Sequence, residues 1–120
     1  MPCGGEGRFP VTMRLKRHGD FLRVFRNGRT VAEACLVVHV LPSDTGPRLG
    51  IVVSRKFGPA VRRNLAKRRI REAFRRCARD LPKVDLIVRP RAGCCEATVE
   101  AIEQILRDGV SRSMDREDRR

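Results

Sequence analysis

The side chains best suited to chemistry lie between residues 55 and 79, and almost all of them are basic. This stretch of 25 residues holds eleven Lys or Arg and a single acid, Glu72. Positive charges at this density repel one another along a helix unless a polyanion lies close by. Nucleic acid is the common macromolecule with a matching charge density, and both Arg and Lys bind its phosphate oxygens. The segment therefore predicts a nucleic-acid-binding surface.

The spacing within this segment separates a core-facing stripe from a polar stripe. At about 100° per residue, the small and apolar side chains fall on one arc: Ala66, Ile70, Ala73, Phe74, Cys77 and Leu81. A second arc carries an amide and a row of cations: Asn64, Lys67, Arg68, Arg71 and Arg75. Alternatively, this second arc is an ordinary solvent-exposed face. Such a face usually carries acids four residues from its cations, so that the two pair, and these acids are missing here.

The sequence offers few groups that could cut a phosphodiester bond. Such chemistry needs paired metal-binding carboxylates or a His acid–base pair, and the chain has only His18 and His39. Asp85, between apolar residues of a predicted strand, has no acidic partner nearby in sequence. The five Cys show neither CxxC nor zinc spacing, so we expect free thiols. We therefore expect no catalytic residue, no metal site and no organic cofactor in the chain itself.

Composition indicates one folded, strongly basic domain. The 120 residues are 41% hydrophobic, carry a net charge of +13 and have a pI near 11.2. That length suffices for one core, and the charge is typical of nucleic-acid binders. No segment approaches the roughly 18 apolar residues of a membrane span, and the N-terminal residues lack the apolar core of a secretory signal. We therefore expect a cytoplasmic protein that does not bind membranes.

Periodicity predicts three helices and three strands. A short amphipathic helix is expected at 20–27, with Asp20 as its cap and Gly28 as its end, and longer helices at 58–79 and 96–107. Strands are expected at 34–41, 49–53 and 84–89, the first two pairing antiparallel. Residues 1–12 are expected to form a flexible leader, 13–110 the domain, and 111–120 a disordered charged tail.

A second candidate surface combines aromatic and basic side chains near the first helix. Single-stranded nucleic acid is held by cations along its backbone and by π-faces under its bases. Because Trp and Tyr are absent, Phe, His and Arg must provide the stacking. Phe21 and Phe25 lie on one helical face, and His39 lies in a strand among aliphatic residues. Alternatively, Phe21 and Phe25 are ordinary core residues, and His39 is a sheet residue whose ring nitrogens are hydrogen-bonded within the fold.

The basic segment resembles the signature of the bacterial ribonuclease P protein subunit. That family shows a strand, a Ser-basic-Lys-x-Gly-x-Ala-Val turn and an Arg-Asn-basic helix. Here the pattern runs from Val53 through Ser54 and Gly58 to Arg63-Asn64 and on to Phe74, and it continues upstream from Leu15 to Gly28. The similarity covers residues 13–110. Leu65 departs from the family, where a third basic residue often follows Arg-Asn; Arg62 and Arg69 are expected to compensate.

The resemblance implies an α+β fold, a single-domain two-layer α/β sandwich of order α-β-β-(β)-α-β-α. It also implies a left-handed crossover around the basic helix, against the usual preference. The implied partners are the catalytic RNA of ribonuclease P and precursor tRNA, whose 5′ leader is removed by hydrolysis. The Mg²⁺ would be bound mainly by the RNA, so the chain would be a holoenzyme subunit without catalytic residues, and no obligate protein partner is expected.

The resemblance also assigns roles by position. The residues that would bind the RNA subunit are Arg55, Lys56, Arg63, Asn64, Lys67, Arg68 and Arg71. The residues that would bind the precursor leader are Lys16 and Arg17, by charge, and Phe21, Phe25 and His39, by stacking in a cleft between the first helix and the sheet.

Three other classes of protein share some of these features. A non-enzymatic RNA-binding protein of ribosomal type fits the size and charge, but not the ordered signature or the paired Phe. A helix-turn-helix DNA binder would lack the predicted strands. A protein-only nuclease is disfavoured because the acids form no cluster.

Overall fold

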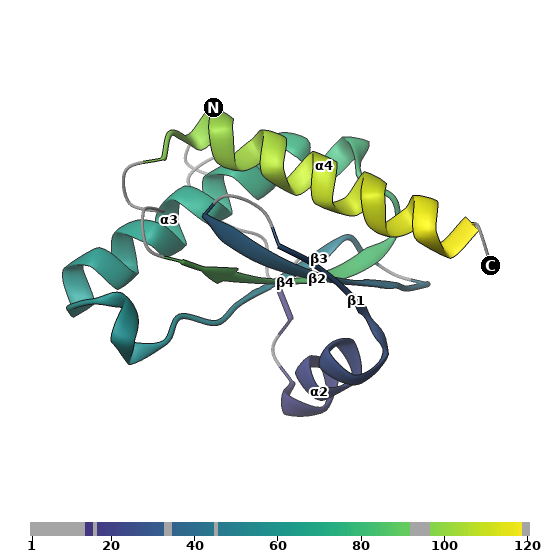
Figure 1. The fold of residues 1–120 in the computed structure, drawn as a ribbon, viewed down its shortest axis with the longest axis horizontal. Coiled ribbons are helices and arrows are strands. Elements are labelled where there is room, and N and C mark those ends of the chain that lie inside the picture. Colours follow the sequence, from purple (N-terminus) through teal and green to yellow (C-terminus); the bar gives the residue numbers. More distant parts are fainter. Residues whose placement is uncertain (1–13, 16, 33–34, 45, 92–96, 119–120) are drawn as a thin grey trace.

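The fold, seen here in a computed structural model, is a four-stranded sheet with helices on both faces (Figure 1). The structure describes residues 14–15, 17–32, 35–44, 46–91 and 97–118. In chain order the elements are α2 (His18–Asn27), β1 (Arg29–Ala32), β2 (Leu36–Pro42), β3 (Arg48–Ile51), the 3-10 turn η2 (Arg55–Phe57), α3 (Ala60–Cys77), the 3-10 turn η3 (Ala78–Asp80), β4 (Val84–Pro90) and α4 (Val99–Asp118). Helices α3 and α4 cover one face, and α2 lies on the other (Figure 1). The predicted α+β single domain is confirmed.

The strand order β1-β2-β4-β3 corrects one prediction. The strands expected at 34–41 and 49–53 do not pair with each other: β2 pairs antiparallel with β1 and β4, and β3 pairs in parallel with β4. The sequence pattern missed β1, a four-residue strand whose Arg29 and Thr30 are polar. Strand β4 is buried over its first five residues, which suits a central position between two neighbours. It therefore separates β2 from β3.

Helix α3 makes the crossover that parallel strands β3 and β4 require. The arc predicted to face the core does so: Ala66, Ile70, Ala73, Phe74 and Cys77 are all fully buried. These side chains pack with the alternate residues Leu36, Val38 and Val40 of β2 in the main core. The core therefore fixes how α3 is rotated about its axis. The left-handed crossover stays a prediction.

Helix α4 is longer than the sequence suggested and corrects the expected tail. It begins at Val99, after Thr98, whose Oγ1 accepts the Ala101 N–H at 3.0 Å. It continues to Asp118, so residues 111–118 are helical and not disordered. The reason is that the apolar period continues: Val110 is 2% exposed and Met114 packs partly buried against the core. The predicted leader at 1–12 lies outside the described residues.

Helix α2 packs on the opposite face of the sheet through a small separate cluster. Leu15, Val24 and Ile87 are buried there, and Phe21 packs against them. Gly28 ends the helix as predicted, because a Cβ at that position would lie 2.6 Å from the Val24 carbonyl oxygen. The helix starts at His18, so Asp20 lies in its first turn and is not the cap that was expected.

Candidate RNA-binding surfaces

The turn before α3 exposes two of the predicted RNA-binding cations, Arg55 and Lys56. Ser54 Oγ accepts the Lys56 N–H at 2.9 Å and so caps η2. Gly58 follows with φ +149°, a conformation that side chains rarely adopt, and Pro59 then leads into the first turn of α3. The predicted turn residues thus place both cations at the N-terminal end of the helix.

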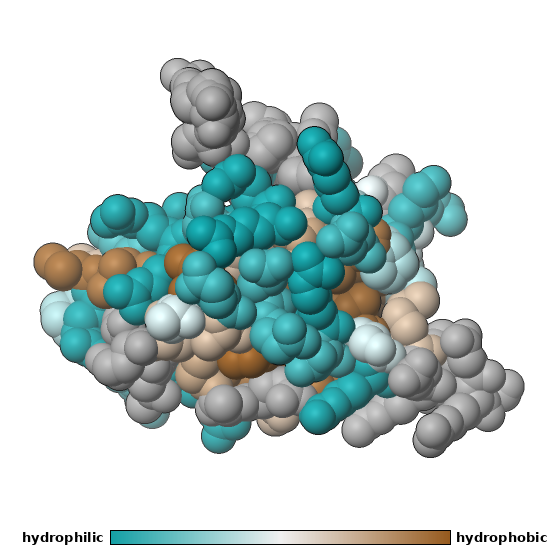
Figure 2. All heavy atoms as spheres, turned by 90° about the horizontal axis from the view of Figure 1, so that it is seen from above, coloured by the Kyte–Doolittle hydropathy of each residue, from teal (hydrophilic) through white to brown (hydrophobic). Residues whose placement is uncertain are grey.

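The outer side of α3 carries polar side chains that we call the cationic face: Arg63, Asn64, Lys67, Arg68 and Arg71. Asn64, Arg68 and Arg71 are exposed, whereas Arg63 and Lys67 are half-buried. Lys67, Arg68 and Arg71 have no hydrogen bond or ion pair with any described residue. Hydrophilic atoms cover most of the molecule's helical side (Figure 2). The buried stripe thus holds a row of uncompensated positive charges in solvent.

Other cations of α3 are neutralised within the fold. Arg75 was predicted on the same arc as the cationic face, but it forms a hydrogen-bonded ion pair with Glu72. The hydrogen bond from Arg75 lowers the pKa of Glu72 below its ordinary value. Arg76 pairs with Glu72 at 3.5 Å and with Glu100 of α4 at 2.9 Å. Arg69 donates to the Ala97 carbonyl at 2.8 Å. Arg69 therefore holds the segment before α4, which weakens the expectation that it compensates for Leu65.

On the opposite side of the sheet, Phe25 and His39 form an aromatic pair. Their ring centroids lie 5.0 Å apart at an interplanar angle of 79°, an edge-to-face contact. Phe25 is 41% exposed, and His39 is 8% exposed. Thr30 Oγ1 lies 3.0 Å from His39 Nδ1, and the buried Nε2 has no partner among the described residues. Burial, together with the charge of Arg89, lowers the His39 pKa and favours the neutral ring.

The other residues predicted to bind the leader do not lie together with the Phe25–His39 pair. Phe21 is half-buried one turn before Phe25, and its ring lies directly against Gly50, where a Cβ would approach it to 2.7 Å. Arg17 is exposed at the start of α2, and Lys16 lies outside the described residues. The structure therefore brings Phe25 and His39 together and places Phe21 towards the β3 edge of the sheet.

Four charged residues that we call the α2 clamp join this helix to the sheet: Asp20, Arg23, Arg48 and Asp85. Asp85, fully buried, accepts two hydrogen bonds from Arg48, each at 2.9 Å, and one from Arg23 at 3.1 Å. Asp20 lies 3.6 Å from Arg23 and 3.7 Å from Arg48. The one buried acid that the sequence suggested is therefore saturated by two Arg. Its partners lie 37 and 62 residues away, so no local pattern could have identified them.

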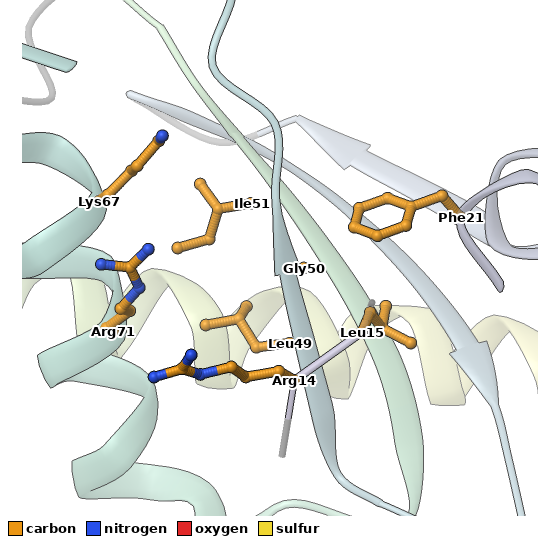
Figure 3. A pocket seen from close by; sticks show the side chains of 8 residues that line it. All are labelled: Arg14, Leu15, Phe21, Leu49, Gly50, Ile51, Lys67 and Arg71. Atoms are coloured by element: carbon orange, nitrogen blue, oxygen red, sulfur yellow. The ribbon is translucent and has the colours of Figure 1, made fainter. Parts of the chain in front are cut away.

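A cavity of about 170 Å³ lies beside β3 and is lined by residues of α3, of α2 and of the segment before α2 (Figure 3). Lys67 and Arg71 of α3 line one side, together with Arg14. Phe21 lines the other side, and Gly50 lies between the two sides (Figure 3). Sequence reasoning missed Arg14 and Gly50, because nothing local indicates that residues 14 and 50 lie beside α3.

The described residues contain no group of three or more His, Cys, Asp or Glu side chains that could hold a metal ion. None of the described helices is both long enough and apolar enough to cross a bilayer. Cys77 is buried, and burial raises its pKa to about 11. A thiol with that pKa stays protonated at neutral pH and is a poor nucleophile.

Comparisons with known proteins identify the family. Residues 9–113 match the family model for ribonuclease P. The chain belongs to the ribonuclease P protein family. The ribonuclease P protein component of Rhodococcus opacus is 37% identical over 112 residues, covering 86% of this chain and 90% of the relative. That of Brevibacillus brevis is 42% identical over 96 residues, covering 78% and 76%.

Solved ribonuclease P proteins have the same fold. The RNase P protein of Staphylococcus aureus is 35% identical, with a TM-score of 0.71 over 82% of this chain and 93% of that one. The RNase P protein of Thermotoga maritima is 37% identical, also with a TM-score of 0.71, over 82% and 96%. The predicted resemblance is therefore confirmed, and the family implies an RNA partner and a role in tRNA processing. The roles of individual side chains stay predictions.

Proposed function

We propose that this ribonuclease P protein binds the catalytic RNA of the holoenzyme through the cationic face of α3, with Arg55 and Lys56 extending the contact. The main support is the row formed by Lys67, Arg68 and Arg71, which is held rigid by a buried stripe and has no acidic partner among the described residues. Such a row suits the phosphates of a folded RNA. The neutralised Arg75 and Arg76 lie outside the proposed contact.

We further propose that the 5′ leader of precursor tRNA binds on the opposite side of the sheet. Phe25 is exposed beside His39, and the pair offers an aromatic platform; the Nε2 of His39 has no partner among the described residues. Bases of a single strand stack on such platforms irrespective of sequence. Arg17 and Lys16 would neutralise the leader phosphates, and Phe21 would extend the platform.

The proposed reaction is endonucleolytic hydrolysis that releases the leader and gives the mature tRNA 5′ end. Its Mg²⁺ ions would be bound mainly by the RNA. The described residues supply a poor donor set, because the buried carboxylate of Asp85 already accepts three hydrogen bonds from Arg48 and Arg23. The chain would therefore position the two RNAs without taking part in bond cleavage. We propose that it acts in the cytoplasm and needs no obligate protein partner.

A cleavage assay tests this proposal. The purified protein is mixed with the ribonuclease P RNA of its own organism and a labelled precursor tRNA at low Mg²⁺. We expect faster leader release than with RNA alone, because the protein offsets repulsion between the two RNAs. If cleavage does not accelerate and unrelated RNAs bind equally tightly, the protein is instead a general RNA binder of ribosomal type.

A further inference from the structure

Helix α2 covers only part of its face of the sheet (Figure 1). Along β4, alternate side chains point to this face. The first two of them, Asp85 and Ile87, are fully buried; Asp85 bonds to Arg23 of the helix, and Ile87 packs with Val24. The third, Arg89, is exposed. The cover that α2 provides therefore ends between Ile87 and Arg89.

Two apolar side chains flank Arg89 on the neighbouring strands. Val37 of β2 is its antiparallel partner and is half-buried. On the other side, the Val52 N–H donates to the Val88 carbonyl at 3.1 Å, which extends the pairing of β3 with β4. Ile51 packs against the main core, so Val52 points to the α2 side, where it is 37% exposed. We call Val37, Arg89 and Val52 the open row, a cation between two apolar side chains.

No described acid neutralises Arg89. It has no hydrogen bond or ion pair with a described residue. The acid that points to the same side of β4, Asp85, is already bound by Arg48 and Arg23. The guanidinium lies near the aromatic pair instead, because the pKa of His39 is lowered by burial and then by the charge of Arg89. The open row therefore brings an uncompensated positive charge close to the exposed aromatic platform.

We infer that Arg89 binds a phosphate of the precursor leader, next to the nucleotide whose base stacks on Phe25, while the two valines of the open row pack against the sugar or base that follows. This inference rests on the proposed leader site. A single strand is held by cations along its backbone and by ring faces under its bases. Arg17 lies about 12 Å from Phe25 along α2, whereas Arg89 lies about 7 Å from His39 along the strands. Its planar fork can also bind two oxygens of one phosphate.

The first test compares cation variants in the reconstituted holoenzyme. Arg89→Gln removes the charge of the open row, whereas Lys83→Gln removes an equal charge just before the other end of β4, about 20 Å away. Loss of one charge-assisted hydrogen bond should weaken precursor binding about tenfold in Arg89→Gln. Binding of mature tRNA and of ribonuclease P RNA should stay unchanged, and Arg89→Lys should recover most of the affinity for the precursor.

The control should behave differently. Lys83→Gln should change precursor binding less than about twofold, because only long-range attraction is lost. Equal weakening by Lys83→Gln and Arg89→Gln would overturn the inference. So would a loss of affinity for mature tRNA or for ribonuclease P RNA in Arg89→Gln, since the contact would then not be with the leader.

The second test locates the phosphate. Uncharged methylphosphonate linkages replace the leader phosphates one at a time, and each precursor is bound to wild-type and to Arg89→Gln holoenzyme. We expect one linkage to weaken binding about tenfold in the wild type and less than about twofold in Arg89→Gln, because two changes that remove the same contact are not additive. An abasic nucleotide next to that linkage should show the same coupling with Phe25→Ala.

The inference and the proposed function fail in different ways. If an abasic nucleotide couples to Phe25→Ala but no neighbouring linkage couples to Arg89→Gln, the inference fails and the proposed leader site stands. If neither couples and the wild-type protein does not accelerate cleavage, the proposed function fails and the inference fails with it.

Discussion

The α2 clamp gives the sharpest prediction for stability, through the change Arg48→Met. Methionine keeps most of the Arg48 side-chain volume but removes both of its 2.9 Å hydrogen bonds to Asp85. The carboxylate is fully buried and would keep a single bond, from Arg23. Leaving a buried charge without its main partner costs about 3–5 kcal/mol. Because Arg23 remains, we expect about 3 kcal/mol, the lower end of that range.

The matched control is Arg23→Met, which removes the third hydrogen bond to the same carboxylate. Arg23 is 48% exposed, compared with 21% for Arg48, so solvent already screens its interaction. We therefore expect Arg23→Met to cost about 1 kcal/mol. The double change of Arg48→Met with Asp85→Leu should recover much of the loss, because it removes the buried charge together with its partner.

Urea unfolding followed by far-UV circular dichroism measures these values. Fluorescence is a poor probe here, because the chain has neither Trp nor Tyr. Phosphate concentration is held constant, since anions bound to so basic a protein add to its apparent stability. A loss below about 1 kcal/mol for Arg48→Met, or equal losses for the two Arg variants, would refute the argument that burial of Asp85 sets the cost.

Three further predictions concern binding and pH. Arg71→Ala should lower the slope of log affinity for ribonuclease P RNA against log salt by about 0.7 to 0.9; an equal change in Arg79→Ala, an exposed cation beyond the cationic face, would contradict this. Phe25→Ala should weaken precursor binding by about 1–3 kcal/mol and leave mature tRNA binding unchanged. The control Leu22→Ala, at another exposed position of α2, should change the binding of neither RNA, and filter binding measures both affinities. Because the His39 pKa lies below its ordinary value of 6.5, the unfolded chain binds this proton more readily, so stability should fall as pH drops through and below that value. His39→Gln should reduce that fall in urea unfolding between about pH 7.5 and about pH 5.5, and an unchanged pH dependence would contradict the assignment.

Local signals predicted the elements that have a strong period or a clear end. The stripe from Ala66 to Cys77 predicted both the helix and its buried side, and Gly28 predicted the end of α2. The strand β1 could not be recognised, because it has only four residues, two of them polar, and so carries no clear alternation. The sequence underestimated the length of α4 because charged residues around Val110 and Met114 interrupt the apolar pattern. The burial of these two side chains depends on the core against which they pack.

The candidate sites also combine features that the sequence predicts with contacts that only the fold creates. The sequence alone determined that the chain is strongly basic, that α3 has a buried and a cationic side, and which family it resembles, because these features depend on composition and spacing along one element. Only the tertiary structure decided which cations remain unpaired, since Glu100 and Ala97 reach Arg76 and Arg69 from another segment. It also decided that Asp85 meets Arg23 and Arg48, and that Arg14, Gly50 and Arg71 surround one cavity. Such contacts depend on strand order and on helix packing, which no local pattern specifies.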